Sequence, residues 1–243
     1  MADPTPLEQF DRALVVTAHP DDVDFGFAGS VALLTEAGVE VTYCVVTDGQ
    51  AGGFDRDVPR DQIPTIRRAE QTAAAAEVGV SDVRFLGRID GEVVNDLPLA
   101  RDISREIRRV RPDLVVTSSP DRNYRFVGAS HPDHRRVGDA TLDAVYPFAR
   151  NPFAFPELLD DEGFDAWIVG EVWLLGDPRP DRFLDVTDVV DRKLAAIRSH
   201  VSQLTDPDAL EERIHGWLSQ TARAGGLGEG RLAEAVRAVV IDR

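Results

Sequence analysis

The chain has 243 residues, of which 43% are hydrophobic, and a formal net charge of −16. This composition fits a globular α/β protein, and the negative charge argues against nucleic acids and anionic membranes as partners. Because there is one cysteine, no apolar run of membrane-spanning length and no signal-peptide pattern at 1–10, we expect a cytoplasmic protein without an intrachain disulfide or thiolate metal cluster.

Strand-like and helix-like segments alternate along the first half of the chain. The expected strands are 12–17, 39–47, 83–86 and 114–117. The expected helices are 25–37, 63–78, 99–109 and 131–148. Strands that alternate with helices favour right-handed crossovers. The pattern therefore predicts a Rossmann-like α/β fold, with a mostly parallel sheet flanked by helices.

The second half of the chain is less regular. A loop is expected at 151–163, a strand at 171–175, and a glycine-rich break at 225–230 before a short last helix. An amphipathic helix is expected at 187–204, because apolar residues recur there at helical spacing. Its apolar face would contain Val190, Leu194, Ile197, Val201 and Leu204. No internal repeat or interdomain linker is visible, so we expect 1–243 to form one domain.

Polar residues follow three of the expected strands. The first strand leads into the tetrapeptide H-P-D-D at 19–22, and the second leads to Asp48. The fourth strand leads to a segment that ends in H-P-D-H at 131–134. In open parallel sheets, sites form beyond the carboxyl ends of the strands. We therefore expect these groups to meet at one edge of the sheet.

The two His-Pro-Asp motifs together have the composition of a catalytic zinc site. Such a site takes three protein ligands and leaves a position for water. His19, one aspartate of the 21/22 pair and one histidine of the 131/134 pair would supply the ligands. The other aspartate and histidine would remain free for proton transfer and oxyanion stabilisation. Each motif alone also fits a helix start, because acidic residues are favourable there and Ser130 and Asp133 have capping-box spacing.

The order of several motifs resembles a known family. AHPDD, TDGQAGG, RRAE, FLGRIDGEV, RPDLVVTSSP, HPDHRRVGDATLDAV and RKLAAIRSHVSQ follow one another along the chain. This series is similar to that of the PIG-L/LmbE family of zinc-dependent N-deacetylases. The resemblance implies a hydrolase that removes an acetyl group from an N-acetylglucosamine-type or related amide substrate. It also implies Zn²⁺ as cofactor and raises the expectation of a homo-oligomer.

The resemblance also assigns roles that spacing leaves open. His19, Asp22 and His134 match the zinc ligands, and Asp21 matches the general base that acts on the zinc-bound water. His131 matches the histidine that stabilises the tetrahedral intermediate. Asp133 matches the carboxylate that, in the family, orients this histidine and favours its charged form.

Several further residues are weaker candidates for contacts with the substrate. Many family members have glutamate directly after the aspartate pair, whereas this chain has Val23 there and Asp24 one position later. Arg67 and Glu70 match the Arg-x-x-Glu of the family, or they form an ion pair along a helix. The candidate substrate-binding residues are Arg67, Asp48, Arg122, Arg125 and His200, with the two loop arginines suited to an anionic group.

Three other classes of function compete with the hydrolase. The DDVD stretch at 21–24 resembles the Asp-x-Asp sites of glycosyltransferases, but that interpretation leaves H-P-D-H unexplained. Gly26 and Gly29 are spaced too closely for a dinucleotide phosphate loop, and instead favour close packing of a helix on the sheet. A metal-binding protein without catalysis is the third alternative, and acetate release from N-acetylated sugars would separate it from the enzyme.

Overall fold

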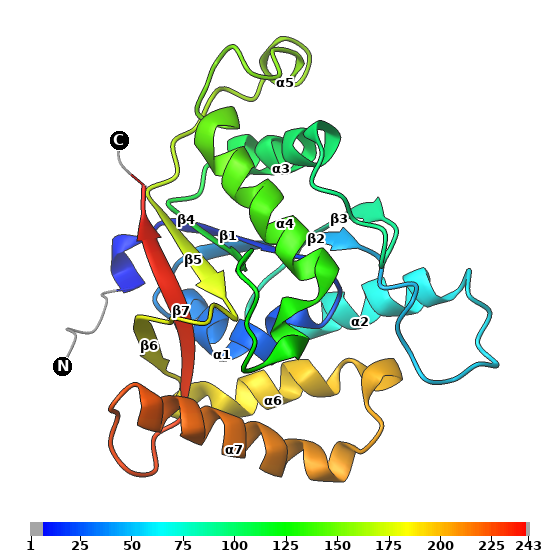
Figure 1. Ribbon diagram of the computed structural model, residues 1–243, viewed down its shortest axis with the longest axis vertical. Coiled ribbons are helices and arrows are strands. Elements are labelled where there is room, and N and C mark those ends of the chain that lie inside the picture. Colours follow the sequence, from blue (N-terminus) through cyan, green and yellow to red (C-terminus); the bar gives the residue numbers. More distant parts are fainter. Residues whose placement is uncertain (1–6, 242–243) are drawn as a thin grey trace.

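The sheet of this protein has seven strands and carries helices on both faces (Figure 1). The computed structural model describes residues 7–241, so part of the polar start at 1–10 lies outside the described residues. The strand order is β3-β2-β1-β4-β5-β7-β6. The strands are β1 (Arg12–Thr17), β2 (Glu40–Thr47), β3 (Asp82–Arg88), β4 (Leu114–Ser118), β5 (Glu171–Leu175), β6 (Arg182–Asp185) and β7 (Ala233–Val240).

The first five strands are parallel to one another, and β7 pairs antiparallel with both β5 and β6. The central strands β1 and β4 are almost wholly buried, as expected for parallel strands that are covered on both faces. The predicted fold class, a mostly parallel α/β sheet flanked by helices, is confirmed.

Two separate apolar clusters fill the space between the sheet and its helices. Figure 1 shows α3 and α4 crossing one face of the sheet, while α1, α2 and α6 lie on the other. The helices are α1 (Asp22–Glu36), α2 (Ile63–Glu77), α3 (Leu97–Val110), α4 (Pro132–Asp143), α5 (Glu157–Asp160), α6 (Val190–Arg198) and α7 (Pro207–Ala224). None of the helices within 7–241 is both long and apolar enough to cross a membrane.

The expected helix at 131–148 is only partly correct. Regular helix begins at Pro132 and ends at Asp143, and a wider π-type turn continues to Phe148. Tyr146 inside that turn is extended, with φ −144° and ψ 119°. The cause is Pro147, because proline cannot donate a helical hydrogen bond and pushes the preceding residue toward the extended region.

The expected helix at 187–204 is also interrupted. Its regular part is α6, which ends at Arg198, and a separate 3-10 turn follows at Val201–Gln203. Val201 is 73% exposed, so its assignment to the apolar face was wrong. The break coincides with His200, whose ring is fully buried and bonded to Asp24 of α1. This tertiary contact competes successfully with continuation of the helix.

The expected short last helix is wrong, because residues 233–240 form strand β7 between β5 and β6. The segment AEAVRAVV contains strong helix formers, yet pairing with two neighbouring strands overrides that local preference. Strand β6 and helix α7 were not among the expected elements. In α7 the signal was present, because Leu210, Ile214, Leu218 and Ala222 recur at helical spacing and are buried.

Candidate metal centre and active site

The two His-Pro-Asp motifs meet where the strand order changes direction. β1 is the strand from which the sheet extends to β2 on one side and to β4 on the other. His19 follows β1, whereas His131 and His134 lie at the start of α4, which follows β4. Ligands bind in open α/β sheets in this crevice, outside the carboxyl ends of the strands. The fold therefore joins motifs that lie more than a hundred residues apart.

Three side chains form a tight triangle of potential metal ligands. Nδ1 of His19 lies 3.3 Å from Nε2 of His134. The Asp22 carboxylate faces both nitrogens, with Oδ1 at 3.0 Å from His134 Nε2 and Oδ2 at 3.5 Å from His19 Nδ1. Ligand atoms around a tetrahedral zinc ion lie roughly 3.3–3.6 Å apart, given metal–ligand distances of about 2.0–2.2 Å. The His19–Asp22–His134 triangle therefore fits a zinc ion.

The charges in the triangle also favour a cation. Burial lowers the pKa of His19, but Asp22 and hydrogen bonds to Asp133, Asp22 and Asp90 raise it to about 12. Burial likewise lowers the pKa of His134, which Asp22 raises above its ordinary value. Two protonated rings would repel each other across 3.3 Å. A dication held between neutral rings supplies the same positive charge beside Asp22 without that repulsion.

The opposite nitrogen of His19 is held by two carboxylates. His19 Nε2 lies 3.0 Å from Asp90 Oδ1 and 3.3 Å from Asp133 Oδ2. Asp133 Oδ2 also accepts from the backbone N–H of Gly91 at 2.6 Å. Carboxylates in this position fix the ring orientation of a metal-binding histidine and leave its other nitrogen free for the metal. The same three side chains, His19, Asp90 and Asp133, also lie close enough together to form a potential metal-binding group of their own.

These contacts correct one expectation and add one residue. The Asp133 carboxylate contacts His19 and Gly91, so it makes no orienting hydrogen bond to His131, which the family resemblance implied. Its charge still raises the pKa of His131, in line with the other half of that implied role. Asp90 was missed, although it follows β3 at the same edge of the sheet and lies in the quoted motif FLGRIDGEV. The rule that identified Asp48 after β2 applies equally to Asp90.

His131 is oriented by backbone rather than by a carboxylate. The N–H of Asp133 donates to His131 Nδ1 at 3.2 Å, which leaves Nε2 as the protonated nitrogen of the neutral ring. The ring stands edge-on to that of His19, with centroids 4.9 Å apart. Burial, and positive charge at His19 and His134, lower the pKa of His131, while the carboxylates of Asp133 and Asp22 raise it less. His131 is thus a neutral N–H donor beside the triangle.

Asp21 lies directly before α1 in a strained backbone conformation. Its φ of 91° is in the left-handed region, which costs a residue with a Cβ atom roughly 1–3 kcal/mol. Asp21 occupies the N-cap position, but its side chain does not cap the helix. Instead, Oδ2 accepts a hydrogen bond of 3.0 Å from Arg67 Nη2. Burial, which outweighs the effect of Arg67, raises the pKa of Asp21 to about 6.

The two adjacent aspartates therefore have different surroundings. Burial raises the pKa of Asp22, but His134 and His19 hold it well below its usual range. Asp22 lies between the two histidines, whereas Asp21 faces Arg67. The turn thus presents one carboxylate suited to bind metal and one suited to accept a proton.

The weaker candidates separate into buried and exposed residues. Arg67 is 2% exposed and binds Asp21, so the alternative ion pair with Glu70 does not form. Glu70 instead accepts hydrogen bonds from Ser202. The guanidinium of Arg68 binds Asp48 through both carboxylate oxygens, at 2.9 and 2.8 Å. These contacts give Arg67 and Asp48 protein partners rather than open faces toward a substrate.

The remaining candidates differ in burial. His200 is fully buried, with Nε2 at 2.7 Å from Asp24 Oδ2, so it does not face a substrate. Arg122 and Arg125 are exposed in the loop before the Val127–Ser130 turn that leads into His131. The loop is shaped by Asn123, whose Oδ1 accepts from the backbone N–H groups of Arg125 and Phe126. Both arginines are thus accessible to solvent in the loop that precedes α4.

The structure also weighs against two alternative functions. Asp24 is fully buried and bonded to Gln71 and His200, so Asp22 and Asp24 do not form a joint Asp-x-Asp site for a nucleotide-sugar phosphate. A Cβ atom on Gly29 would lie 2.9 Å from Val186. This distance confirms that the glycine permits close packing of α1 rather than phosphate binding.

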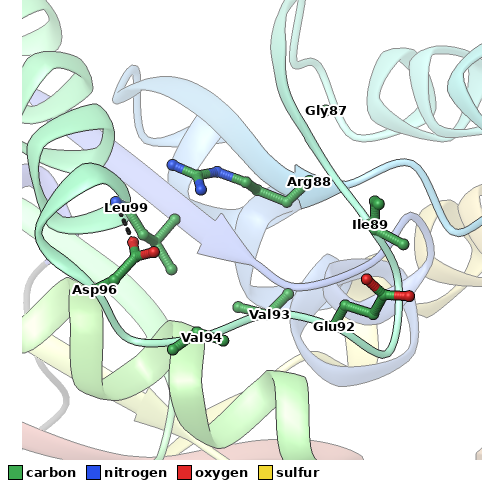
Figure 2. Close-up of a pocket in the computed structure, with 8 residues that line it drawn as sticks. All are labelled: Gly87, Arg88, Ile89, Glu92, Val93, Val94, Asp96 and Leu99. Carbon is green, nitrogen blue, oxygen red and sulfur yellow. Dashed lines mark hydrogen bonds between the residues drawn. The ribbon is translucent and has the colours of Figure 1, made fainter.

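A cavity lies beside the loop that carries Asp90 (Figure 2). Its volume is about 270 Å³, and its lining residues are Gly87, Arg88, Ile89, Glu92, Val93, Val94, Asp96 and Leu99. None of these is a predicted site residue. Asp90 and Gly91 are not among the lining residues, and they contact His19 and Asp133 instead. We therefore assign the chemistry to the histidine triangle rather than to this cavity.

Comparison with known proteins identifies the family. The family model "PIG-L: GlcNAc-PI de-N-acetylase" matches residues 14–145, which include both His-Pro-Asp motifs. The chain belongs to this family. The matched region of this PIG-L family protein begins in β1 and ends just beyond α4, so it contains all of His19, Asp22 and His134.

Similar proteins extend the match beyond that region. The chain is 33% identical over 241 residues to diacetylchitobiose deacetylase of Thermococcus kodakarensis, covering 96% of this chain and 85% of the relative. It is 30% identical to a probable N-acetyl-alpha-D-glucosaminyl L-malate deacetylase 2 of Bacillus subtilis, covering 79% of this chain and 83% of that one. The solved structure of N,N'-diacetylchitobiose deacetylase from Pyrococcus horikoshii has a TM-score of 0.87 and 29% identity, covering 97% of this chain and 86% of that chain.

Proposed function

We propose that this protein is a zinc-dependent N-deacetylase, a hydrolase that removes the acetyl group from an amino sugar or a related small amide. The observation that carries the proposal is the His19–Asp22–His134 triangle with Asp21 beside it. The family membership and the deacetylase names of the relatives support the same reaction class. We further propose that residues 1–243 form one such domain.

In this proposal, His19, Asp22 and His134 hold the metal ion. Two imidazoles and one carboxylate are a usual donor set for catalytic zinc, which leaves one position open. When bound, such an ion lowers the pKa of water and polarises a carbonyl group. Asp90 and Asp133 hold the ring of His19 from behind, which fixes the direction of its ligand nitrogen.

Asp21 acts as the general base. It accepts the proton of the attacking water while the water oxygen bonds to the amide carbon. The carbon–nitrogen bond then breaks, the proton passes from Asp21 to the leaving amine, and acetate is the other product. A carboxylate with a pKa near 6 suits both steps, because it can accept and return a proton near neutral pH. Arg67 holds one oxygen of Asp21 and leaves the other for this transfer.

His131 stabilises the negative charge that develops on the amide oxygen. Its Nε2–H is free to donate because the backbone of Asp133 occupies Nδ1.

Arg122 and Arg125 lie close to His131 in the sequence and are exposed. We propose that they contact an anionic group of the substrate when it carries one.

The reaction is tested by acetate release from a panel of N-acetylated amino sugars, with and without a zinc chelator. The proposal expects release that the chelator abolishes and that added zinc restores. Zinc binding without release from any substrate of the panel would instead indicate a metal-binding protein without this activity. Binding of a uridine nucleotide with manganese, again without acetate release, would favour a glycosyltransferase.

Two variants test the assigned roles. Asp21→Asn should retain zinc and lose nearly all turnover, because the amide cannot accept the proton of water. His134→Ala should lose bound zinc by elemental analysis. Near-normal turnover of zinc-replete Asp21→Asn, or full zinc content in His134→Ala, would remove the corresponding role.

A further inference from the structure

The backbone of Asp21, which is in the left-handed region, is hydrogen-bonded to a buried glutamine on α2. Asp21 has a φ of 91°, and its own side chain does not cap α1. Its backbone N–H donates instead to Oε1 of Gln71 on α2, at 2.8 Å. Arg67, one turn earlier on the same helix, holds the carboxylate of Asp21. Helix α2 therefore holds both the backbone and the side chain of this residue.

Gln71 is itself fixed by two further buried side chains. Its Nε2 donates to Asp24 Oδ2 at 2.8 Å, and the same oxygen lies 2.7 Å from His200 Nε2. Gln71, Asp24 and His200, which we call the Gln71 relay, are all fully buried. None of the three is among the proposed metal ligands, and none has an exposed face toward a substrate.

The order of donors and acceptors leaves Gln71 only one orientation. An ionised carboxylate only accepts hydrogen bonds, so the amide nitrogen must face Asp24. The amide oxygen must then face the N–H of Asp21. Glutamate or an apolar residue at position 71 cannot satisfy both neighbours, because one lacks the donor and the other lacks donor and acceptor.

We propose that Gln71 is a positioning residue for the reaction assigned to this site. It locks the strained peptide of Asp21 and thereby aims the carboxylate that accepts the proton of water. The inference rests on the proposed function, in which Asp21 is the base. Because a small displacement of a catalytic group lowers the rate by up to about 100-fold, Gln71 should affect turnover rather than binding.

The test compares kcat, KM and zinc content in Gln71→Met and Gln71→Glu. We expect kcat to fall about 10–100-fold in both, with KM within twofold of the wild type and full zinc content. The double variant Gln71→Glu/Asp24→Asn exchanges the amide and the carboxylate between the two positions. It restores a donor that faces residue 71, and His200 Nε2 can accept from the same amide in its other neutral tautomer, so most of the lost kcat should recover.

A matched control separates positioning from general stability. Ser104→Ala removes a buried helix hydroxyl, which donates to the backbone oxygen of Ala100 on α3. Because α3 lies on the other face of the sheet from α1 and α2, this variant should keep the wild-type kcat. Hydrogen exchange of the Asp21 amide gives a readout besides activity, and should accelerate at least tenfold in Gln71→Met.

The outcomes are distinguishable. Absence of acetate release by the zinc-loaded wild type overturns the proposed function. Release by the wild type together with an unchanged kcat in Gln71→Met overturns the positioning role alone. A loss of kcat that the exchanged double variant does not recover, or an equal loss in Ser104→Ala, also overturns it. Loss confined to the position 71 variants, with recovery in the exchange, supports it.

Discussion

Replacing Lys193 by methionine should destabilise the protein more than any comparable change on the same helix. Lys193 on α6 and Glu234 on β7 form an ion pair of 2.7 Å, with side chains 0% and 2% exposed. Lys193 Nζ also donates to the backbone oxygens of Asp24 and Phe25 in α1. Glu234 accepts from the backbone N–H groups at 29 and 30. One buried cluster thus joins α1, α6 and β7.

The magnitude follows from the charge that the substitution leaves behind. Removing one partner of a buried ion pair costs about 3–5 kcal/mol, because the remaining charge has no counter-ion and no water. In a protein of this size, 1 kcal/mol corresponds to about 2–4 °C in melting temperature, so Lys193→Met should lower it by about 6–20 °C. Lys193→Met/Glu234→Gln removes the orphaned charge and should recover part of the loss.

The assay is urea unfolding followed by tryptophan fluorescence, for which the fully buried Trp173 is a suitable reporter. Arg198→Met is the matched control on the same helix. Its ion pair with Glu211 has the same 2.7 Å distance, but the side chains are 50% and 55% exposed. Exposed pairs contribute about 0–1 kcal/mol. Equal losses in Lys193→Met and Arg198→Met would refute the argument that burial decides the magnitude.

Three further predictions concern the surroundings of the site. Gly138→Ala would place a Cβ atom 2.0 Å from Ser118 O, so α4 should move, with weaker zinc binding and a lower melting temperature; wild-type values of both would contradict this packing. Asp90→Ala removes a carboxylate that contacts His19 Nε2, and should raise the zinc dissociation constant about 10–100-fold in a chelator competition. An unchanged dissociation constant would show that Asp90 does not support the ligand. Asp48→Asn should leave KM within twofold, because Arg68 already engages this carboxylate; a clearly raised KM would return Asp48 to the substrate-binding residues.

The sequence by itself was sufficient for the architecture of the first half. Strands such as β1 and β4 are continuous apolar runs because both faces of a parallel sheet are buried, and the residues between them have helical periodicity. The same alternation places the carboxyl ends of the strands at one edge. The two His-Pro-Asp motifs could therefore be predicted to meet, although they are far apart along the chain.

The C-terminal half was less predictable because its elements depend on distant partners. The segment at 233–240 has helix-forming residues, but it is a strand because β5 and β6 supply its hydrogen bonds. The helix expected at 187–204 is interrupted where His200 bonds to Asp24. Neither partner can be seen in a local window of sequence.

Only the tertiary structure decided what each polar group of the site contacts. Asp21 and Asp22 are identical in type and adjacent, yet Asp22 lies between two histidines and Asp21 faces Arg67. The contact of Asp133 with His19, the contribution of Asp90 and the Gln71 relay were likewise not visible in the sequence. A hydrogen bond requires a donor–acceptor distance correct to a few tenths of an ångström and a nearly linear angle, and both are set by helices and strands brought together from across the chain.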